Sequence, residues 1–554
     1  HHKLQKQRTM NQEQEIDGRI VFKYDTGWKE LLESDRFKKE LCEDILEPYI
    51  LNQRWYGGKA SALKYIEVID SFPIEDEVDT FYGIVLEVNF REAFVHNYFL
   101  PIAFVTDQEV VGDKFIAHLK LNGTSGFLVD ALLLESFRKQ IFEKILEGEK
   151  YRYKEVAYRR GRSNQSQGYK SSRLMGVEQS NTSIIYNNKY ILKIFRRVYV
   201  DENPDYEISK YLTAKALFNN TPKYLGSITL KFSDKNVITL GLMQELVPNQ
   251  GDAWEYFVHN LKLTFEELSR QQPKLETLRA TKYLEQISIT DVPASILAWC
   301  PIEFFEDVSQ LALRTAQMHI ALGQERINTA FTPQAFSNDY SVWLKNRLIY
   351  QFENRINLVE NNLHKLDGLQ LELANELLSK KKIIRKQFLD FDETMLKSER
   401  LRIHGDYHLG QVLVQDRDFF IIDFEGEPES TIRDRKVKQP PIKDIAGIFR
   451  SFNYAIYATV FNNHESYDFE LEELFEVADV LYSHIIGVFL KTYINEVQTA
   501  NLNIGYIKEI EFLLQYCLLE KAVYELGYEL NARPRWAIIP LKGISNILNQ
   551  QHYE

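Results

Sequence analysis

The stretch HGDYHLGQVLVQDRDFFIIDFEGEP, residues 404–428, places two carboxylates and an amide at spacings that suit phosphoryl transfer. Asp406 is followed five residues later by Gln411, and Asp423 comes after an apolar run. One carboxylate can accept the proton of an acceptor hydroxyl. The amide oxygen and the second carboxylate can hold magnesium on the phosphates of a nucleotide.

A short hairpin is the element that would bring these residues together. VLVQ and FFIIDFE flank DRD, which predicts two paired strands. The ends of that hairpin would bring Asp406 and Gln411 near Asp423. HGDYHLGQ and DFE also keep the spacing of H-R-D-x-x-x-x-N and D-F-G in protein kinases. The alternative is a carboxylate-capped hairpin without chemistry.

A phosphate-binding lysine is predicted upstream. SIIYNNKYILKIFRR, residues 183–197, reads as two strands around an Asn-Asn-Lys turn, with Lys193 in the second strand. In NPDYEISKYLTAKALF, Asn203 is the expected N-cap and Pro204 the first helical residue. Glu207 could then pair with Lys193 and hold its ammonium group toward the α- and β-phosphates. A solvated edge lysine is the alternative.

The turn that would cover the nucleotide has no G-x-G-x-x-G pattern. GVEQSNTS, residues 176–183, occupies its place before Lys193. Its backbone amides and the hydroxyls of Ser180, Thr182 and Ser183 could contact phosphate oxygens. Clusters of Ser, Thr and Asn also form ordinary turns, which is the alternative interpretation.

The connector between two lobes is predicted at LMQELVPNQGDAWEY, residues 242–256, after the strand-like NVITLGLM. The backbone of Gln244, Leu246 and Val247 could form hydrogen bonds with an adenine edge. An ordinary interdomain linker would have a similar sequence.

Composition excludes several classes of protein. The 554 residues include 67 basic and 79 acidic side chains, a net charge of −12, which argues against bulk affinity for nucleic acid or an anionic membrane. Cys42, Cys300 and Cys517 are too widely spaced for a zinc motif or a disulfide framework, as in a reducing cytoplasm. No apolar run approaches a membrane span, and no signal-peptide h-region is present.

The pattern of elements predicts an α+β chain. Short strand-like runs fill residues 18–110, residues 120–150 read as helical, and residues 176–250 return to strands around one helix. After about residue 252 the chain is mostly helical. We expect these parts: a tag remnant and disordered start (1–17), an N-terminal cap (18–115), an intermediate nucleotide-binding lobe (116–248) and a helical catalytic and acceptor-binding lobe (249–554).

Several longer motifs resemble the bacterial maltokinases, ATP-dependent enzymes that make maltose 1-phosphate and are sometimes fused to trehalose synthase. The motifs, in the order in which that family has them, are QRWYGGKA, GVEQSNTSIIY, LKIFRR with NPDYE, PNQGDAWEY, HGDYHLGQVL, IDFEGEP, KDIAGIFRSFNYA and YELNARPRWAIIPL. The resemblance implies a bilobal protein-kinase-like fold, of the aminoglycoside-phosphotransferase type, with an N-terminal α+β cap and a mostly helical C-terminal lobe. It also implies ATP and Mg²⁺ as cofactors.

The same resemblance implies roles for individual residues. Asp406 becomes the catalytic base, and Gln411 and Asp423 become the magnesium ligands. Lys193 and Glu207 become the pair that orients the phosphates. Glu425, two residues after Asp423, could assist the metal or the acceptor sugar. His404 could orient the catalytic loop through a backbone hydrogen bond. His408 is expected to be structural.

The acceptor site is expected on the helix around residues 518–531. One stripe of that helix is apolar and predicts the core face: Leu519, Val523, Leu526 and Leu530. A second stripe has charged and aromatic groups that suit a sugar: Lys521, Tyr524, Glu525 and Tyr528. A solvated polar face is the alternative. Arg533 and Trp536 in the following ARPRW match the family and favour a sugar site.

Two departures from the family pattern border this region. GEPESTIRDRKVKQPPIKD keeps a basic cluster but lacks the expected proline and the acid followed by paired arginines, and Gly527 stands where a larger residue is typical. The resulting prediction is a cytoplasmic ATP- and Mg²⁺-dependent kinase that phosphorylates maltose at the anomeric hydroxyl. The alternatives are a kinase for glucosamine or an aminoglycoside, and a catalytically silent partner of trehalose synthase.

Overall fold

The computed structural model describes residues 13–16, 19–107, 112–148, 155–176, 180–215, 218–234 and 236–550. It divides into two compact units, one formed by His1–Lys215 with Pro222–Val247 and the other by Ala216–Thr221 with Pro248–Glu554. Most of the expected disordered start lies outside the described residues, as do residues 177–179 of the expected phosphate-covering turn.

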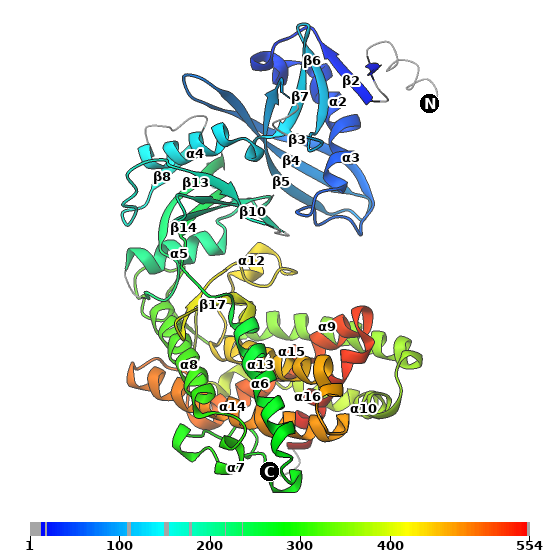
Figure 1. The fold of residues 1–554 in the computed structure, drawn as a ribbon, viewed down its shortest axis with the longest axis vertical. Helices are drawn as coiled ribbons and strands as arrows, with labels where there is room; N and C mark the ends of the chain where they lie inside the picture. The colour runs from blue at the N-terminus through cyan, green and yellow to red at the C-terminus, as the bar shows by residue number, and fades with distance from the viewer. Residues whose placement is uncertain are drawn as a thin grey trace. The chain divides into compact units, whose positions relative to one another are not determined.

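The first unit begins with an eight-stranded sheet, which contains the blue strands of Figure 1. Its strand order is β1-β2-β6-β7-β5-β4-β3, and β12 also pairs with β5. The strands are β1 (Glu13–Ile16), β2 (Arg19–Tyr24), β3 (Leu63–Glu75), β4 (Thr80–Phe90), β5 (Val95–Val105), β6 (Ala117–Leu121), β7 (Thr124–Asp130) and β12 (Arg197–Val198). Short helices α2 (Asp35–Glu40) and α3 (Leu46–Leu51) share a core with this sheet.

The helix expected over residues 120–150 is correct only in its second half. Residues up to Asp130 form β6 and β7. Apolar residues alternate with polar ones in β6, whereas Phe127, Leu128 and Val129 form a continuous buried run in β7. Helix α4 (Glu135–Glu147) follows.

The second sheet of this unit has six strands in the order β8-β13-β14-β11-β10-β9. They are β8 (Val156–Arg160), β9 (Ser172–Leu174), β10 (Asn181–Tyr186), β11 (Tyr190–Phe195), β13 (Tyr224–Ser233) and β14 (Asn236–Glu245). The expected turn between β10 and β11 is confirmed, with Asn187 and Asn188 both at φ 55°. Helix α5 (Pro204–Ala214) begins as predicted, since the Asn203 side chain accepts a hydrogen bond from Asp205 N.

The second unit is mostly helical, as predicted. Its longer helices are α6 (Ala253–Gln271), α8 (Ile302–Leu322), α9 (Asn338–Asn362), α10 (Gly368–Ser379), α11 (Lys381–Leu389), α13 (Ile442–Asn463), α14 (Leu471–Thr499), α15 (Ile507–Ala532) and α16 (Ile538–Gln550). The short helices are α7 (Ala294–Leu297) and α12 (Ile432–Arg435), and the short strands are β15 (Gln334–Ala335), β16 (Glu399–Arg400), β17 (Val412–Gln415) and β18 (Asp418–Ile421).

Helix α13 is the centre of the second unit. It is buried over almost its whole circumference and contacts α6, α14 and α15 (Figure 1). Such a helix is normally apolar all round. The buried polar residues Lys443 and Asp444 in its first turn are exceptions, and both contact the candidate site described below. Within the described ranges, no helix has the length and apolar character needed to cross a membrane.

Candidate active site

The hairpin predicted from VLVQ and FFIIDFE is present in the second unit. Strands β17 and β18 are antiparallel, with Val412 opposite Ile421. Asp416 and Arg417 form the connecting turn, at φ 48° and 66°. Positive φ at both central residues is the geometry of the tight two-residue turns that match the twist of a hairpin.

Backbone pairing continues past the hairpin and brings the two predicted metal ligands together. The N–H of Ile422 donates to the carbonyl oxygen of Gln411 at 3.0 Å, and Asp423 is the next residue. Asp423 has φ 60°, an unfavourable backbone conformation for a non-glycine residue that is concentrated at functional sites. The hairpin therefore brings the backbone of Gln411 next to the residue that precedes Asp423.

This donor set fits a magnesium ion shared with a nucleotide. Mg²⁺ takes oxygen ligands and is usually bound through one or two protein carboxylates plus substrate phosphates and water. Across the described ranges, no group of three or more His, Cys, Asp or Glu side chains could hold a metal ion. Gln411 and Asp423 would thus supply the protein's share of the ligands.

The loop before the hairpin is anchored by Asp444 of α13. Its carboxylate accepts hydrogen bonds from the backbone N–H groups of His404 at 2.9 Å and Gly405 at 3.0 Å, and lies 2.8 Å from His319 Nε2. Burial alone would raise the pKa of Asp444, but the hydrogen bond and charge of His319 hold it below its usual value. His404 Nε2 in turn lies 2.7 Å from the carbonyl oxygen of Ile422, which ties the loop to the hairpin.

Asp406 lies in this loop beside His408. The distance between Asp406 Oδ2 and His408 Nε2 is 3.8 Å. Gly410 N donates to His408 Nδ1 at 3.2 Å, which leaves Nε2 to carry the proton of a neutral imidazole. Burial raises the pKa of the Asp406 carboxyl, and the charges of His408, His404 and Lys521 oppose that rise. A carboxylate with a raised pKa is a better proton acceptor near neutral pH.

The acid side of the pH profile should report this environment. Asp406 must be unprotonated to accept a proton, so a raised pKa makes kcat/KM fall at a higher pH than an ordinary aspartate would. When it is protonated in acid, His408 opposes the rise in the Asp406 pKa. His408→Gln removes this opposing charge, and we expect the acid limb of kcat/KM to move to still higher pH. The exposed His364→Gln on the surface is the control and should leave the limb in place. An acid limb unchanged in His408→Gln would contradict this assignment.

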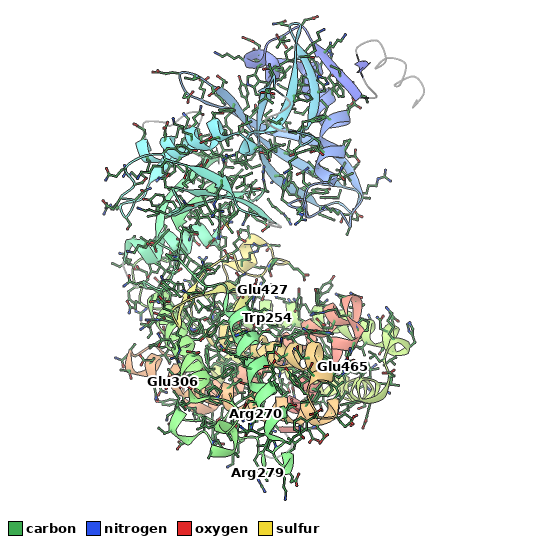
Figure 2. All side chains as sticks on the ribbon, in the orientation of Figure 1. Trp254, Arg270, Arg279, Glu306, Glu427 and Glu465 are labelled. Atoms are coloured by element: carbon green, nitrogen blue, oxygen red, sulfur yellow. The ribbon has the colours of Figure 1, made fainter. Side chains whose placement is uncertain are left out.

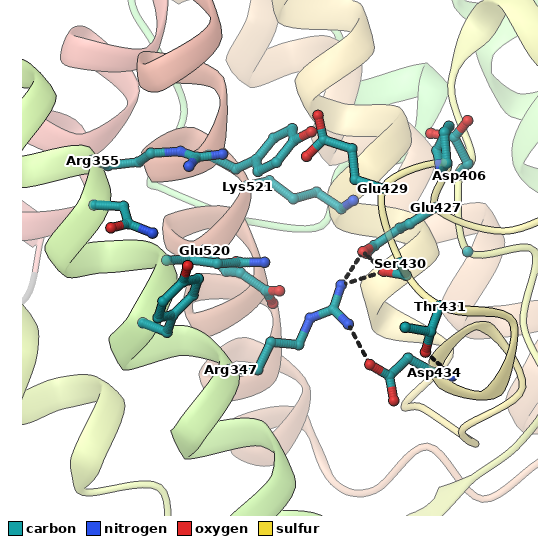
Figure 3. Close-up of a pocket in the computed structure, with 16 residues that line it drawn as sticks. Arg347, Arg355, Asp406, Glu427, Glu429, Ser430, Thr431, Asp434, Glu520 and Lys521 are labelled. Atoms are coloured by element: carbon teal, nitrogen blue, oxygen red, sulfur yellow. Dashed lines mark hydrogen bonds and ion pairs between the residues drawn. The ribbon is translucent and has the colours of Figure 1, made fainter. Parts of the chain in front are cut away.

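A cavity of about 390 Å³ opens beside Asp406 (Figure 3). That volume lies within the range of roughly 300–1,000 Å³ typical of small-molecule sites. The charged residues that line it are Arg347, Arg355, Asp406, Glu427, Glu429, Asp434, Glu520 and Lys521. Five of these eight are carboxylates, so the cavity wall is rich in hydrogen-bond acceptors and negative charge.

Glu427, labelled in Figure 2, is held from two sides. Arg347 of α9 donates to it and also lies 3.8 Å from Asp434 (Figure 3). The buried Lys443 Nζ lies 3.0 Å from Glu427 Oε1 and 3.8 Å from Glu520 Oε1. Burial would raise the pKa of Glu427, but Lys443 and Arg347 hold it well below its usual value. Glu427 is therefore ionised and already paired.

The predicted acceptor helix α15 contributes Lys521 and Tyr524 to the cavity. The guanidinium of Arg355, another residue of α9, lies 4.9 Å from the centroid of the Tyr524 ring. A Cβ at Gly527 would lie 2.6 Å from the Arg355 side chain, so the small residue makes room for it. The unusual glycine noted in the sequence is thus explained by the arginine that crosses it.

Six other residues predicted for the acceptor or its loop do not line this cavity: His404, Glu425, Glu525, Tyr528, Arg533 and Trp536. Glu525 instead forms an ion pair with Arg450 of α13 at 2.8 Å. Arg533 stacks over the Trp536 ring at 4.1 Å, and Tyr528 is 60% exposed. The predicted core stripe is confirmed, because its four leucine and valine residues are buried. The functional roles of the six residues stay predictions.

Sequence reasoning missed the contribution of α9 to this cavity. Arg347 and Arg355 precede the catalytic loop by more than fifty residues, and nothing in their local sequence distinguishes them from solvated helix residues. Lys443 was also missed, although a lysine within the apolar run of α13 is a signal for a buried charge with partners.

In the first unit, Lys193 lies opposite Ser183 on the paired strands β11 and β10. Lys193 Nζ is 2.7 Å from Asp205 Oδ2, a fully buried carboxylate in the first turn of α5. The structure thus adds Asp205 to the partners of Lys193, and the role of Glu207 stays a prediction. Ser183 Oγ is buried without a hydrogen-bond partner in the described part of the chain, on the same face as Lys193.

Other predicted nucleotide contacts have partners within this unit. Thr182 Oγ1 accepts a hydrogen bond from Arg196 Nε at 2.9 Å. The Gln244 side chain donates to Ser209 Oγ at 3.0 Å, and the N–H of Leu246 donates to a carbonyl oxygen just before β11 at 2.9 Å. Val247 is buried, and Ser180 is exposed. Their contacts with a nucleotide stay predictions.

Comparisons with known proteins show that the fold is kinase-like. No family model matches the chain. A solved structure described as "Glucosamine kinase in complex with glucosamine, ADP and inorganic phosphate" has a TM-score of 0.62 and 15% identity, and covers 95% of this chain and 100% of that one. A second glucosamine kinase structure, crystal form A, has a TM-score of 0.60 with 15% identity and covers 95% and 99%. The predicted bilobal, kinase-like α+β fold is therefore confirmed.

One particular relative is found by sequence. A glucosamine kinase from Streptacidiphilus jiangxiensis is 23% identical over 288 residues, which are 51% of this chain and 55% of that protein. The match thus spans about half the length of the relative. The specific resemblance to maltokinases stays a prediction.

Proposed function

We propose that this chain is an ATP- and Mg²⁺-dependent sugar kinase with Asp406 as its catalytic base. The observation that carries the proposal is the single hairpin that joins the Asp406 loop, Gln411 and the strained Asp423 beside an acid-rich cavity. Gln411 and Asp423 fit Mg²⁺, which when bound would stabilise negative charge on the transferring phosphoryl group. Lys193, fixed by Asp205, would hold the nucleotide phosphates.

In this mechanism the chain mainly positions the reactants. A sugar hydroxyl in the cavity donates a hydrogen bond to the Asp406 carboxylate, and its oxygen forms the new bond to the γ-phosphorus. The bond from that phosphorus to the bridging oxygen of ADP breaks, and the hydroxyl proton passes to Asp406. Asp444 fixes the loop by accepting hydrogen bonds from the backbone N–H groups of His404 and Gly405. Asp406 is therefore positioned before the reaction begins.

An amino sugar such as glucosamine is the acceptor that we place first. Its ammonium group would complement the surplus of carboxylates in the cavity, where five carboxylates face three basic side chains. The sequence relative and the solved structures support this choice, since both are glucosamine kinases. The denser acidic wall is the feature that the sequence alone did not reveal.

Maltose, phosphorylated at its anomeric hydroxyl, is the second candidate. Lys521 and the Tyr524 ring both line the cavity and suit neutral sugar hydroxyls and ring faces. A partnership with trehalose synthase goes with this alternative. A catalytically silent scaffold is disfavoured, because such a protein has no chemical reason to keep Lys193, Asp406 and Asp423 together.

A panel of acceptors tests the proposal. ATP consumption would be measured with glucosamine, N-acetylglucosamine, maltose, glucose, trehalose and an aminoglycoside, with identification of the phosphorylated position. We expect turnover with glucosamine and a kcat/KM roughly 100-fold lower for the uncharged N-acetyl analogue, which leaves carboxylates unpaired. Preference for maltose would transfer the assignment to the second candidate. Nucleotide binding without turnover of any acceptor would support the scaffold.

Lys521 provides a separate test of the cavity as the acceptor site. Lys521→Met keeps the length of the side chain but removes its donors, and we expect the KM of the acceptor to rise roughly tenfold. The KM of ATP should stay within about twofold of wild type, because Lys521 lines the acceptor cavity and is not assigned to the nucleotide. Lys508→Met, at an exposed position of the same helix, is the matched control. Equal effects on both substrates would place the acceptor elsewhere.

A further inference from the structure

The chain passes from the six-stranded sheet to the eight-stranded sheet at one buried residue, Arg196. It follows β11, the strand that carries Lys193, and precedes β12, which pairs with β5. Arg196 is only 2% exposed. Its backbone carbonyl accepts a hydrogen bond from Phe99 N of β5 at 2.7 Å, so both its backbone and its side chain join the two sheets.

The Arg196 guanidinium contacts residues from both sheets. On the side of the eight-stranded sheet it forms a buried ion pair with Asp130 at the end of β7, and it lies 5.3 Å from the centroid of the Trp55 ring. On the other side its Nε donates to Thr182 Oγ1 at 2.9 Å. Thr182 neighbours Ser183, whose partner across the strands is Lys193. One rigid planar group thus connects the N-terminal sheet to the hairpin assigned to the nucleotide.

A purely structural role would not require this arrangement. A buried guanidinium pays a large desolvation penalty, and a hydrophobic residue of similar volume often gives an equally stable protein. The guanidinium contributes geometric specificity, because its rigid planar set of donors fixes the positions of the groups that it binds. Here the ordered group is the first half of the β10–β11 hairpin.

We propose that Arg196 is a positioning residue through which the N-terminal sheet sets the nucleotide-binding geometry of the β10–β11 hairpin. The proposal rests on the proposed function, in that the hairpin must bind a nucleotide. It gives the N-terminal sheet a part in catalysis without direct contact with a substrate. Asp130 and Trp55 then act by fixing the Arg196 side chain, and Arg196 in turn fixes the position of Thr182.

A double-mutant cycle tests the connection in the full-length protein. Asp130→Asn removes the charge that fixes Arg196, and Thr182→Val removes the oxygen that Arg196 binds. Each change should raise the Kd of ATP roughly tenfold, and the double variant should be no weaker than the weaker single variant, because both remove the same connection. Thr124→Val, at an exposed position of β7, is the control and should bind ATP like wild type. The KM of the sugar should not change.

The outcomes separate the two proposals. If wild-type protein binds no nucleotide, the proposed function fails, and this inference fails with it. If wild type binds ATP but folded Asp130→Asn binds it equally well, or if the two losses multiply, Arg196 has no positioning role.

Thermal unfolding reports whether each variant is folded. If Asp130→Asn is not, Trp55→Leu removes only the ring beside Arg196. A several-fold loss of ATP affinity in Trp55→Leu that Trp55→Phe restores then supports the proposal. Wild-type ATP affinity in Trp55→Leu overturns the proposal.

Discussion

Asp406→Asn is expected to reduce kcat by about 10²–10⁴-fold, the usual contribution of a general base, while ATP affinity stays near that of wild type. The substitution keeps the size and shape of the side chain, and among the described residues Asp406 makes no ion pair beyond the 3.8 Å contact with His408. The amide cannot take up the proton of the acceptor hydroxyl. Steady-state kinetics and nucleotide binding, measured on the same preparation, separate these two effects.

The matched control is Asp339→Asn, at an exposed position in the first turn of α9. It changes the net charge by the same amount but lies outside the cavity, and it should turn over at the wild-type rate. Near-normal kcat in Asp406→Asn would remove Asp406 from the role of base. A parallel loss of ATP affinity would indicate that the residue acts on the nucleotide instead.

The catalytic hairpin could be predicted from sequence because every signal for it is local. VLVQ and DFFI have strand-forming residues, Asp416 and Arg417 tolerate a tight turn, and the spacing of Asp406, Gln411 and Asp423 is set along the chain. The N-cap of α5 was predicted for the same reason. Where neighbouring residues determine the geometry, one sequence is enough.

The acceptor cavity could be predicted only in part, because its walls come from segments far apart in sequence. Lys521 and Tyr524 of the predicted stripe on α15 line the cavity, but the same stripe continues to Tyr528, which is largely exposed. Which residues of a helix face reach the cavity depends on the neighbouring helices. In this case α9 supplies Arg347 and Arg355, whose positions no local pattern specifies.

Residues 120–130 illustrate a third limit. Their apolar residues were read as helical, but they form β6 and β7. A parallel neighbour, β2, and an antiparallel neighbour, β5, complete the sheet around them. Short apolar runs do not distinguish a buried strand from a buried helix, so tertiary contacts determine the outcome.

The two buried polar residues at the start of α13 divide the work of supporting the site. Asp444 binds the backbone of the catalytic loop, and Lys443 binds the carboxylates of the cavity wall. Because they are adjacent on one helix, a shift of α13 would move the base and the acceptor wall together. This explains why a buried helix keeps two charges in its first turn, despite their desolvation cost.

Lys443→Met is accordingly expected to lower the free energy of unfolding by about 3 kcal/mol at neutral pH, within the range found when one partner of a buried ion pair is removed. The change leaves Glu427 with Arg347 and the hydroxyl of Ser430, and removes the lysine contact of the nearly buried Glu520. The surface variant Lys381→Met, whose ion pair with Glu360 is half exposed, is the control and should change stability by no more than about 1 kcal/mol.

The pH dependence gives this prediction its sign. Lys443 lowers the pKa of Glu427 in the folded protein. The stability that this ion pair contributes is therefore fully present above the pKa of an unfolded glutamate, and it is lost as the pH falls from there toward the lowered pKa of Glu427. The difference between wild type and Lys443→Met should therefore be largest near neutral pH and shrink in acid, where protonation relieves the unpaired carboxylates. Urea unfolding of both proteins at neutral and mildly acidic pH measures it. A difference that grows on acidification would mean that Lys443 stabilises the fold through its aliphatic contacts rather than through Glu427 and Glu520.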